Sequence, residues 1–359
     1  MKLKIPALML VGLLLTALTS CQKAELPPAV KVTPVSGHDY IFVGLNNAVQ
    51  VIDCETDTVV KTIPFNDYII QGAFSPDGKR YYANAFRCVY VFDTVKQELV
   101  DTYPFSTELS KVTVAGVAPS EDLKTLYIAC TVVKKKQNVP KLNLLPPQLV
   151  VFDLETKKIL RNYEIPLMVS TVLTLRNDPE HLILIGYDVF KFSLKTGKAE
   201  LMETLFNPKK GDKVRNCLPA MTPISPGDHG IVAYPYYAGE GLDVSSGYLM
   251  IDRNQGTTRL LGGNNLWMGY SAMLAPDGKY LYSIMDELVK IDAQTGKTVA
   301  FVQTETGTCY GVTTSSDGRK IYVGPAGPDL SVYDAETLKL LKVIPLEADG
   351  GYAMQRVTL

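Results

Sequence analysis

The sequence predicts an all-β protein, a seven-bladed β-propeller with four-stranded antiparallel blades. Three observations support this fold: a strand phrase that recurs seven times, a hairpin turn that precedes most of its copies, and a repeat length of roughly 40 residues. We expect residues 38–359 to form this single domain, since repetitive β-architectures commonly reach such a length as one unit.

The N-terminus has the features of a lipoprotein signal peptide. Two lysines in the first four residues precede an apolar run of about 14 residues, which is shorter than the roughly 20 that span a bilayer. The run ends in the lipobox Leu18-Thr19-Ser20-Cys21. We therefore expect residues 1–21 to hold the signal peptide and lipobox, with Cys21 as the lipidated first residue of the mature protein. The alternative is an ordinary signal peptide with a chance cysteine.

Residues 22–37 contain three prolines and are predicted to form a tether. Acyl chains at Cys21 would anchor the domain, because each buried CH₂ group contributes ~0.8 kcal/mol. Gln22 follows the cysteine, and by resemblance to Gram-negative lipoproteins this favours the outer membrane over the inner one. The expected location is a lipid anchor that faces the periplasm.

The recurring strand phrase is an alternating apolar strand that ends in Asp and is followed by a short polar turn. Asp bonds the backbone two residues further on and so initiates a tight turn, and Ser does so less strongly. Six copies end in Asp and the seventh ends in Ser193. The copies are residues 49–53, 89–93, 149–153, 189–193, 248–252, 288–292 and 330–334.

A hairpin phrase precedes six of these strands. Three copies are Asp-Gly turns, which are a strong hairpin signal. The copies are residues 74–78, 274–278 and 314–318, with weaker versions at 118–122, 176–179 and 225–228.

Six hairpin phrases against seven strand phrases predict how the ring closes. The first unit, residues 38–65, starts at its second strand, and residues 351–359 supply one strand beyond the seventh unit. We expect the C-terminal strand to complete the first blade, because closure of this kind removes exposed sheet edges.

Two blades carry long insertions between their second and third strands. One is residues 131–148, with three consecutive lysines at 134–136, and the other is residues 234–246. In a four-stranded blade this connection lies on the same face as the connections between blades, so both insertions should lie on one face. Long loops on a rigid scaffold are usually functional or disordered. The lysine run fits a solvated loop tip better than a docking patch.

The inter-blade connections on this face are aromatic. Five aromatic residues come just before or at the start of an innermost strand, so their rings should lie at the channel mouth: Tyr68, Trp267, Tyr270, Tyr310 and Tyr352. They form either a plug whose hydroxyls bond loop backbone or a contact surface for a ligand or partner.

The composition argues against some classes of function. A net charge of −1 gives no general electrostatic case for binding nucleic acid. Three histidines, and cysteines at 54, 88, 130, 217 and 309 without metal-site spacing, argue against a metal centre. The odd cysteine number leaves at least one free thiol, and most of these cysteines should be buried apolar residues. One disulfide is an open alternative, with no pair indicated.

The sequence contains no visible catalytic constellation. The three histidines, at 38, 181 and 229, lie at strand starts or turns, and there is no phosphate loop. Asp188, Asp286 and Glu287 lie between second and third strands and are the carboxylates that a lactonase-like hydrolase could use. Ordinary turn chemistry is the commoner role for such residues.

The chain resembles the β subunit of quinohemoprotein amine dehydrogenase, a seven-bladed propeller, and more loosely the methylamine dehydrogenase heavy chain and YVTN-type repeats. The resemblance covers residues 38–359. It rests on the placement of the two insertions and on His38-Asp-Tyr-Ile41, Tyr333-Asp-Ala-Glu-Thr-Leu338, Pro235-Tyr-Tyr237 and Tyr310-Gly-Val312.

This resemblance implies a non-catalytic subunit of a periplasmic amine-oxidising complex, which serves as docking platform and wall of the amine pocket. The implied partners are a di-haem cytochrome subunit with haem c and a small subunit with cysteine tryptophylquinone, and this chain would hold no redox cofactor. The family's propeller is a soluble subunit, whereas this chain has a lipobox.

Six aromatic residues are the candidates for the partner interface or the amine pocket: Tyr236, Tyr237, Trp267, Tyr270, Tyr310 and Tyr352. Two other interpretations stay open. The chain is either a stand-alone membrane-anchored propeller that binds a ligand or protein at its aromatic face, or a hydrolase.

Overall fold

The computed structural model describes residues 37–217, 229–240, 243–265 and 267–359. The predicted signal peptide, the lipobox with Cys21, the tether up to residue 36 and the predicted turn at 225–228 lie outside the described residues and stay predictions. Within the described ranges every regular element is a β-strand, and no helix there is long and apolar enough to cross a membrane.

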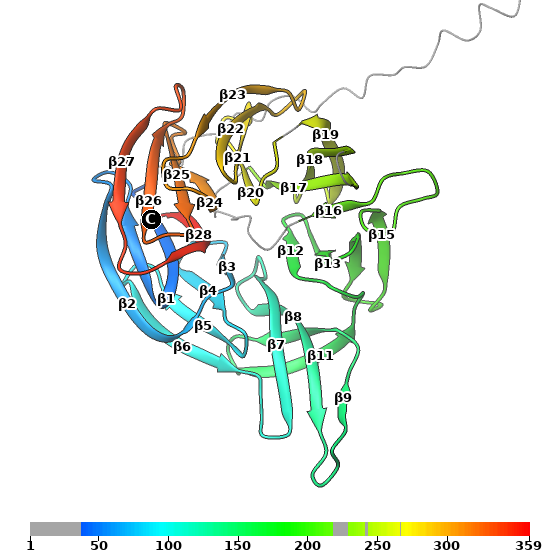
Figure 1. The fold of residues 1–359 in the computed structure, drawn as a ribbon. Coiled ribbons are helices and arrows are strands. Elements are labelled where there is room, and N and C mark those ends of the chain that lie inside the picture. The colour runs from blue at the N-terminus through cyan, green and yellow to red at the C-terminus, as the bar shows by residue number, and fades with distance from the viewer. Residues whose placement is uncertain (1–36, 218–228, 241–242, 266) are drawn as a thin grey trace, which may run out of the picture.

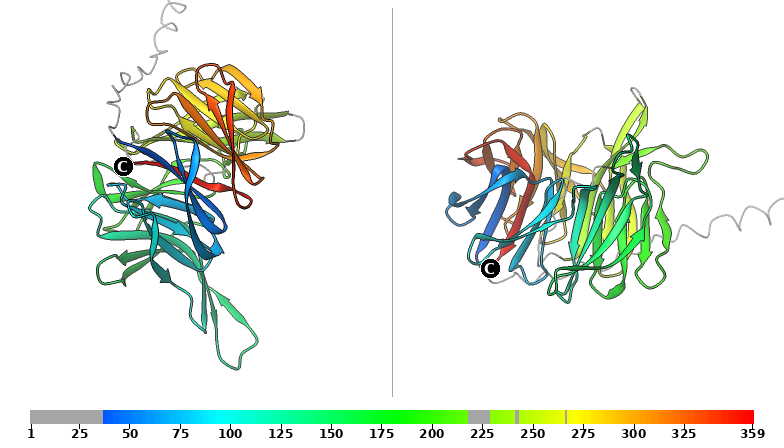
Figure 2. Two further views of the ribbon diagram at one scale, coloured as in Figure 1. Left: turned by 90° about the vertical axis from the view of Figure 1, so that its left-hand side faces the viewer. Right: turned by 90° about the horizontal axis from the view of Figure 1, so that it is seen from below.

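Seven antiparallel sheets stand around a common axis, which confirms the predicted seven-bladed propeller (Figure 1). The innermost strands surround the axis and the outermost strands form the rim (Figure 1). Figure 2 shows the same ring from two other directions.

Blades 2 to 4 run in chain order from the innermost strand outward. Blade 2 consists of β3 (Gln71–Phe74), β4 (Arg80–Asn84), β5 (Cys88–Asp93) and β6 (Glu98–Pro104). Blade 3 consists of β7 (Ser110–Pro119), β8 (Thr125–Lys135), β10 (Gln148–Asp153) and β11 (Lys158–Glu164), with β9 (Leu142–Leu144) beside β8. Blade 4 consists of β12 (Thr171–Leu175), β13 (Asp178–Ile185), β14 (Val189–Ser193) and β15 (Ala199–Glu203).

Blades 5 to 7 repeat this arrangement. Blade 5 consists of β16 (Arg215–Cys217), β17 (Ile231–Glu240), β18 (Asp243–Asp252) and β19 (Thr257–Asn265). Blade 6 consists of β20 (Ser271–Leu274), β21 (Tyr280–Ile284), β22 (Glu287–Asp292) and β23 (Thr298–Gln303). Blade 7 consists of β24 (Cys309–Thr314), β25 (Lys320–Pro325), β26 (Asp329–Asp334) and β27 (Leu340–Pro345).

Blade 1 joins the two ends of the chain. Its strands are β1 (Asp39–Asp53), β2 (Thr58–Tyr68) and β28 (Gly350–Thr358). β1 doubles back at Asn47, whose φ is 66°, so its first half pairs with β28 and its second half with β2. The N–H of Cys54 donates to the carbonyl of Asp39 at 3.1 Å and closes this internal hairpin. The blade therefore has four antiparallel segments, and the predicted closure by the C-terminal strand is confirmed.

Each blade has two kinds of connection, which lie on opposite faces of the ring. We call the face with the turns between first and second and between third and fourth strands the turn face. The opposite face holds the connections between second and third strands and those between blades, and we call it the connection face.

The recurring Asp residues stabilise the turn face as predicted. After β22, Asp292 Oδ1 accepts the backbone N–H groups of Gln294 at 3.2 Å and Thr295 at 2.7 Å. In blade 4, Ser193 takes this position, and its hydroxyl accepts the N–H of Thr196 at 3.2 Å. One hydrogen bond thus replaces two, in agreement with the weaker turn chemistry of Ser.

The Asp-Gly turns also follow one pattern. In the turn before β4, the hydroxyl of Ser75 donates to Asp77 at 2.6 Å, and Gly78 has a φ of 72°. The corresponding position in blade 3 is Leu123, with a φ of 64°. A left-handed conformation is costly for a residue with a Cβ, so this turn carries strain that its glycine-containing counterparts avoid.

Seven apolar cores lie between neighbouring blades, one for each adjacent pair. The largest fully buried side chains include five tyrosines, Tyr81, Tyr234, Tyr248, Tyr322 and Tyr333. This use of tyrosine in the cores accounts for part of the imbalance between 20 tyrosines and one tryptophan.

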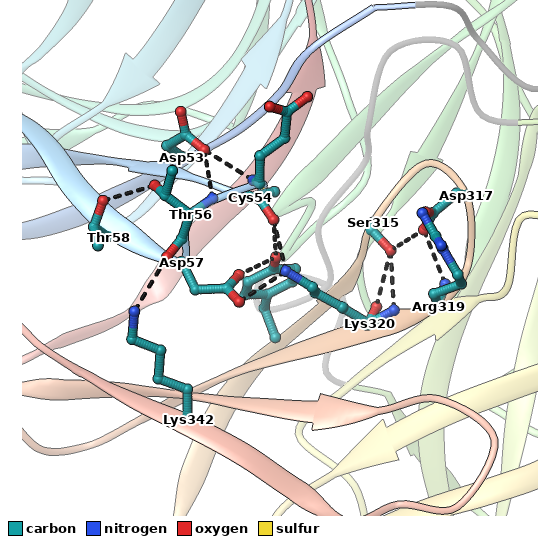
Figure 3. A network of polar contacts seen from close by, with 12 residues as sticks. Asp53, Cys54, Thr56, Asp57, Thr58, Ser315, Asp317, Arg319, Lys320 and Lys342 are labelled. Carbon is teal, nitrogen blue, oxygen red and sulfur yellow. Dashed lines mark hydrogen bonds and ion pairs between the residues drawn. The ribbon is translucent and has the colours of Figure 1, made fainter.

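The junction of blades 7 and 1 also holds a polar network on the turn face (Figure 3). The ammonium of Lys320 donates to Asp57 at 2.7 Å and to the Cys54 carbonyl at 2.8 Å. The Tyr322 hydroxyl donates to the same carboxylate at 2.7 Å. Burial, followed by the charges of its neighbours, strongly raises the pKa of Tyr322, so it stays a donor. Lys342 reaches the Thr56 carbonyl at 3.1 Å from the exposed side.

Candidate binding face

The exposed large apolar side chains are distributed unevenly over the described residues. Two lie on the turn face, Val95 and Leu123. The outer strands at the rim carry others, such as Val60 and Val343. Those on the connection face are Phe86, Leu109, Val139, Leu142, Leu144, Leu167, Met168, Tyr187, Phe206 and Met268. Among the described residues, the connection face is therefore the more apolar of the two faces, and we take it as the candidate binding face.

Tyr270 and Tyr310 form an aromatic pair at the innermost strands of blades 6 and 7. Their ring centroids are 5.3 Å apart at an interplanar angle of 37°. The N–H of Tyr270 donates to the carbonyl of Ile284 at 2.8 Å, which fixes the entrance of the chain into β20. The pairing of β24 with β25 shifts register between Cys309 and Gly311, so Tyr310 is the extra residue of a β-bulge. Bulges redirect side chains, and this one is next to the predicted channel mouth.

Trp267 lies in a different part of the connection face from this pair. Its ring packs against Phe301 of β23, the outer strand of blade 6, with centroids 4.4 Å apart. Its carbonyl accepts a hydrogen bond from the Ser246 hydroxyl. The prediction that all these rings crowd the channel mouth is therefore wrong for Trp267, which lies toward the rim because the connection from blade 5 starts there.

Tyr236 and Tyr237 point to opposite sides of β17, as successive strand residues must. Tyr236 is only 5% exposed and packs in the core between blades 4 and 5, with the Arg215 guanidinium 6.0 Å from its ring centre. Burial raises its pKa. Tyr237 is half-buried on the other side of the strand. In the free chain, Tyr237 is thus the more accessible of the two candidates.

The insertion at 234–246 is a regular hairpin. β17 and β18 pair continuously from Ile231 with Asp252 to Glu240 with Asp243, so the expected long loop is an extended ladder. Tyr352 lies in β28, and its side chain is outside what the structure describes.

Polar side chains link the innermost strands. The Gln71 amide donates to the Thr171 hydroxyl at 3.4 Å, which joins blade 2 to blade 4 at the connection-face ends of their inner strands. The Gln355 amide of β28 donates to the Gly72 carbonyl at 2.6 Å. The Ser271 hydroxyl, fully buried next to Tyr270, has no hydrogen-bond partner among the described residues.

The candidate carboxylates are engaged in the connections themselves. Asp188 is buried and accepts the N–H of Leu205 at 2.7 Å and the Asn207 amide at 2.9 Å. Asp286 accepts the Thr308 hydroxyl at 2.7 Å. Glu287 begins β22 opposite Gln303. Asp188 and Asp286 therefore act as residues that stabilise their connections through hydrogen bonds.

All three histidines of the chain lie at the turn-face ends of strands. His38 contacts Asp53 at 2.8 Å, His181 contacts Asp178 at 2.8 Å, and His229 contacts the Ala275 carbonyl at 3.2 Å. Within the described ranges, no cluster of three or more His, Cys, Asp or Glu side chains could hold a metal.

Cys54, Cys88, Cys130 and Cys309 are buried free thiols, and Cys217 is partly buried. Burial raises the pKa of Cys309 to about 11 and that of Cys54 to about 12, so both stay protonated at neutral pH. A nucleophilic thiolate is thus not available at either position. The prediction that most cysteines act as small buried residues is confirmed.

Several exposed apolar residues escaped prediction. Tyr187 and Phe206 stack with centroids 4.7 Å apart at 20°, on the connection face of blade 4. Leu167 and Met168 lie in the connection from blade 3. The available signal was an apolar residue inside a short connection, where polar turn residues are the norm.

No family model and no curated protein matches the chain. Solved structures with a similar fold include a Kuenenia stuttgartiensis hydrazine synthase, at 16% identity and a TM-score of 0.54 over 84% of this chain and 90% of that chain. A dihydro-heme d1 dehydrogenase NirN, in complex with DHE, matches at 14% identity and a TM-score of 0.53 over 92% of this chain and 78% of that chain. A functionally unknown protein from Desulfotomaculum acetoxidans DSM 771 matches at 14% identity and a TM-score of 0.57 over 89% of this chain and 99% of that chain. These similarities place the chain in the propeller fold class.

Proposed function

We propose that the chain is a non-catalytic propeller subunit of a periplasmic complex that resembles quinohemoprotein amine dehydrogenase. It would be lipid-anchored at Cys21, with the outer membrane favoured. The redox groups would belong to its partners, haem c to a di-haem cytochrome subunit and cysteine tryptophylquinone to a small subunit. The propeller would serve as docking platform and wall of the amine pocket.

One observation carries this proposal: the connection face combines exposed apolar and aromatic side chains with carboxylates that are held in turn hydrogen bonds. Such a face suits binding, because aromatic anchors supply large contact areas and charged residues are scarce at the centres of interfaces. All three histidines lie on the other face. Two of the structures with a similar fold belong to enzymes, a hydrazine synthase and a dihydro-heme d1 dehydrogenase.

The tyrosine pair suits the substrate class. A protonated amine is attracted to the face of an aromatic ring, by about 0.5–2 kcal/mol depending on its desolvation. Tyr270 and Tyr310 are half-buried beside the innermost strands, so a pocket wall formed there would present aromatic rings. Tyr237 and Trp267 would contribute to the wider interface.

The lipobox motivates a second candidate function, because the family's propeller is soluble. In this alternative, the chain is a stand-alone anchored propeller that binds a ligand or protein at the same face.

The test is purification of the native lipoprotein from its own membranes in mild detergent, followed by haem staining and mass spectrometry. Co-purification of a di-haem chain and a small quinone-bearing chain in stoichiometric amounts is the expected result. A single colourless chain, recovered at the same yield in two detergents, would contradict the proposal and favour the stand-alone binder.

A further inference from the structure

The insertion of blade 3 forms an arm that projects beyond the ring. It comprises residues 131–147, with the end of β8 and the short strand β9, which pairs with β8 through Leu144 and Val133, Asn143 and Lys134, and Leu142 and Lys135. Figure 1 and the left view of Figure 2 show β9 and its turn outside the outline of the other blades. Residues 134–144 are all exposed. The expected loop therefore contains a short hairpin ladder, in which Lys134 and Lys135 pair with Asn143 and Leu142.

The two sides of the arm differ in chemistry. On the inner side, Val112, Val132 and Leu145 pack in the core between blades 2 and 3. On the outer side, Leu142 is 60% exposed and Leu144 is 69% exposed. Alternation along the strand places these two leucines on one side of β9, so they form a continuous apolar strip. The fold gains nothing from their exposure, because burial of a leucine contributes to stability and exposure does not.

Lysines surround this strip. Residues 131–148 contain Lys134, Lys135, Lys136 and Lys141 and no acidic residue, although the whole chain has a net charge of −1. Within the described ranges, no ion pair joins any of these four lysines to a carboxylate. Four uncompensated positive charges on one hairpin attract acidic surfaces and set the orientation of an approaching partner.

The face at which the chain enters the propeller bears on whether the arm contacts a protein or a membrane. His38 and Asp39 lie on the turn face, where the His38 ring contacts Asp53 and the Asp39 carboxylate accepts the N–H of Ser316 at 2.6 Å. The described chain begins at the turn face, whereas the arm belongs to the connection face. A tether that continued outward from the turn face would hold a lipid bilayer on the far side of the ring from the arm. The geometry favours a partner that approaches from the periplasm.

We propose that the arm is a docking element for a protein whose surface has an apolar groove bordered by aspartates and glutamates. The leucine strip enters the groove and the lysines pair with its acidic rim. This inference rests on the proposed function only in that both assume a protein partner. It concerns a surface on blade 3, separate from the tyrosine pair of blades 6 and 7.

The first step of the test places a photo-crosslinking phenylalanine analogue at position 144 of the full-length chain in its own cells. A matched control carries it at position 123, which is also exposed but lies on the turn face. We expect one protein adduct from position 144 and none of that mass from position 123. Adducts with lipid, adducts with a second copy of this chain, or the absence of an adduct specific to position 144 would each overturn the inference.

The second step measures binding of the purified adduct partner to two variants. In the first variant, the four lysines become glutamate, and we expect Kd to rise at least 10-fold at 50 mM salt, with a smaller difference at 500 mM because salt screens the charges. In the second, Leu142→Ser and Leu144→Ser, Kd should rise at least 10-fold at both salt concentrations. Unchanged affinity in either variant, at an unchanged melting temperature, would overturn the inference.

The outcomes distinguish this inference from the proposed function. A captured partner whose binding depends on the lysines but which carries no haem would support the docking role of the arm and contradict the amine dehydrogenase proposal. Co-purification of a haem chain that binds all arm variants equally would support the amine dehydrogenase proposal and contradict the docking role of the arm.

Discussion

The two faces of the propeller differ in how regular they are. The turn face repeats one chemistry, in which Asp or Ser side chains accept backbone N–H groups within the same turn. The connection face varies from blade to blade, with a bulge at Tyr310, a ring stack at Tyr187 and an arm at blade 3. The repeated turns thus belong to the scaffold, and the irregular connection face is the one for which we propose a binding role.

Deletion of residues 350–359 removes β28 and should have the largest effect. β28 buries Ala353, Met354 and Val357 and is the innermost segment of blade 1, so its loss opens the ring and exposes two cores. We expect a loss of more than about 5 kcal/mol in the free energy of unfolding, which is comparable with the whole stability of many domains. The measurement is thermal and urea unfolding followed by circular dichroism.

The matched control removes a similar length from the connection face. Asn143 pairs directly with Lys134, so replacing residues 135–142 by Asn-Gly leaves a two-residue hairpin. The melting temperature of this variant should stay within about 2 °C of the parent, since surface changes are usually worth less than 0.5 kcal/mol. Equal destabilisation by both deletions would contradict the division between the faces.

Lys320→Met breaks the network at the junction of blades 7 and 1. The change leaves the largely buried Asp57 carboxylate without its cation, and it removes a hydrogen bond to the Cys54 carbonyl. We expect a loss of roughly 3 kcal/mol, the range for removing one partner of a buried pair. Lys342→Met is the control, because Lys342 makes an exposed bond to Thr56 in the same region and should cost less than about 0.5 kcal/mol. Denaturant titration would measure both variants, and similar losses would contradict the prediction.

Tyr237→Ala tests the connection face. Under the proposed function, truncation of an aromatic anchor should weaken complex formation by about 2 kcal/mol, roughly 30-fold in Kd, with little change in melting temperature. Tyr236→Ala is the contrasting variant, because its ring is in the core and its loss should destabilise the fold by about 3 kcal/mol or more. Binding by Tyr237→Ala that equals binding by the parent would remove Tyr237 from the interface.

Leu123→Gly should stabilise the protein by about 1 kcal/mol, because it relieves a left-handed conformation at a residue that is 42% exposed and so loses little packing. Leu338 has a similar φ of 57° but is buried between blades 6 and 7. Leu338→Gly should therefore destabilise the protein. Urea unfolding measures the change in the free energy of unfolding for both variants. We expect the two changes to have opposite signs, because backbone strain decides the first and packing decides the second, and changes of equal sign would contradict this explanation.

The smallest expected effect concerns pH. Burial lowers the pKa of His38, but the hydrogen bond and charge of Asp53, with Glu55 and Asp39, outweigh it and raise the pKa above 6.5. Charged His38 therefore contributes stability that is fully present below about pH 6.5 and is lost as pH rises through the folded-state pKa. At this partly exposed site the contribution is at most about 1 kcal/mol. His38→Gln should flatten the stability profile between pH 6 and 8, and an unchanged profile would contradict the assignment.

The fold could be predicted from the sequence because each repeat contains local sequence signals for its turns. The phrases that end in Asp53 and Asp292 mark the turns between third and fourth strands, and the mismatch in phrase number predicts closure by β28. The binding face was harder to predict. Placing Tyr236 in a core requires knowing which side of β17 faces blade 4, and this depends on the orientation of the whole blade. Trp267 reaches the rim through a connection whose path has no local sequence signal.

The most direct test of the division between the faces is hydroxyl-radical footprinting of the native membrane-extracted assembly against the purified free chain. We expect protection of Phe86, Tyr187 and Met268 on the connection face and unchanged oxidation of Val95 and Leu123 on the turn face. Protection confined to the turn face, or no protection on either face, would contradict the claim that the connection face binds a partner.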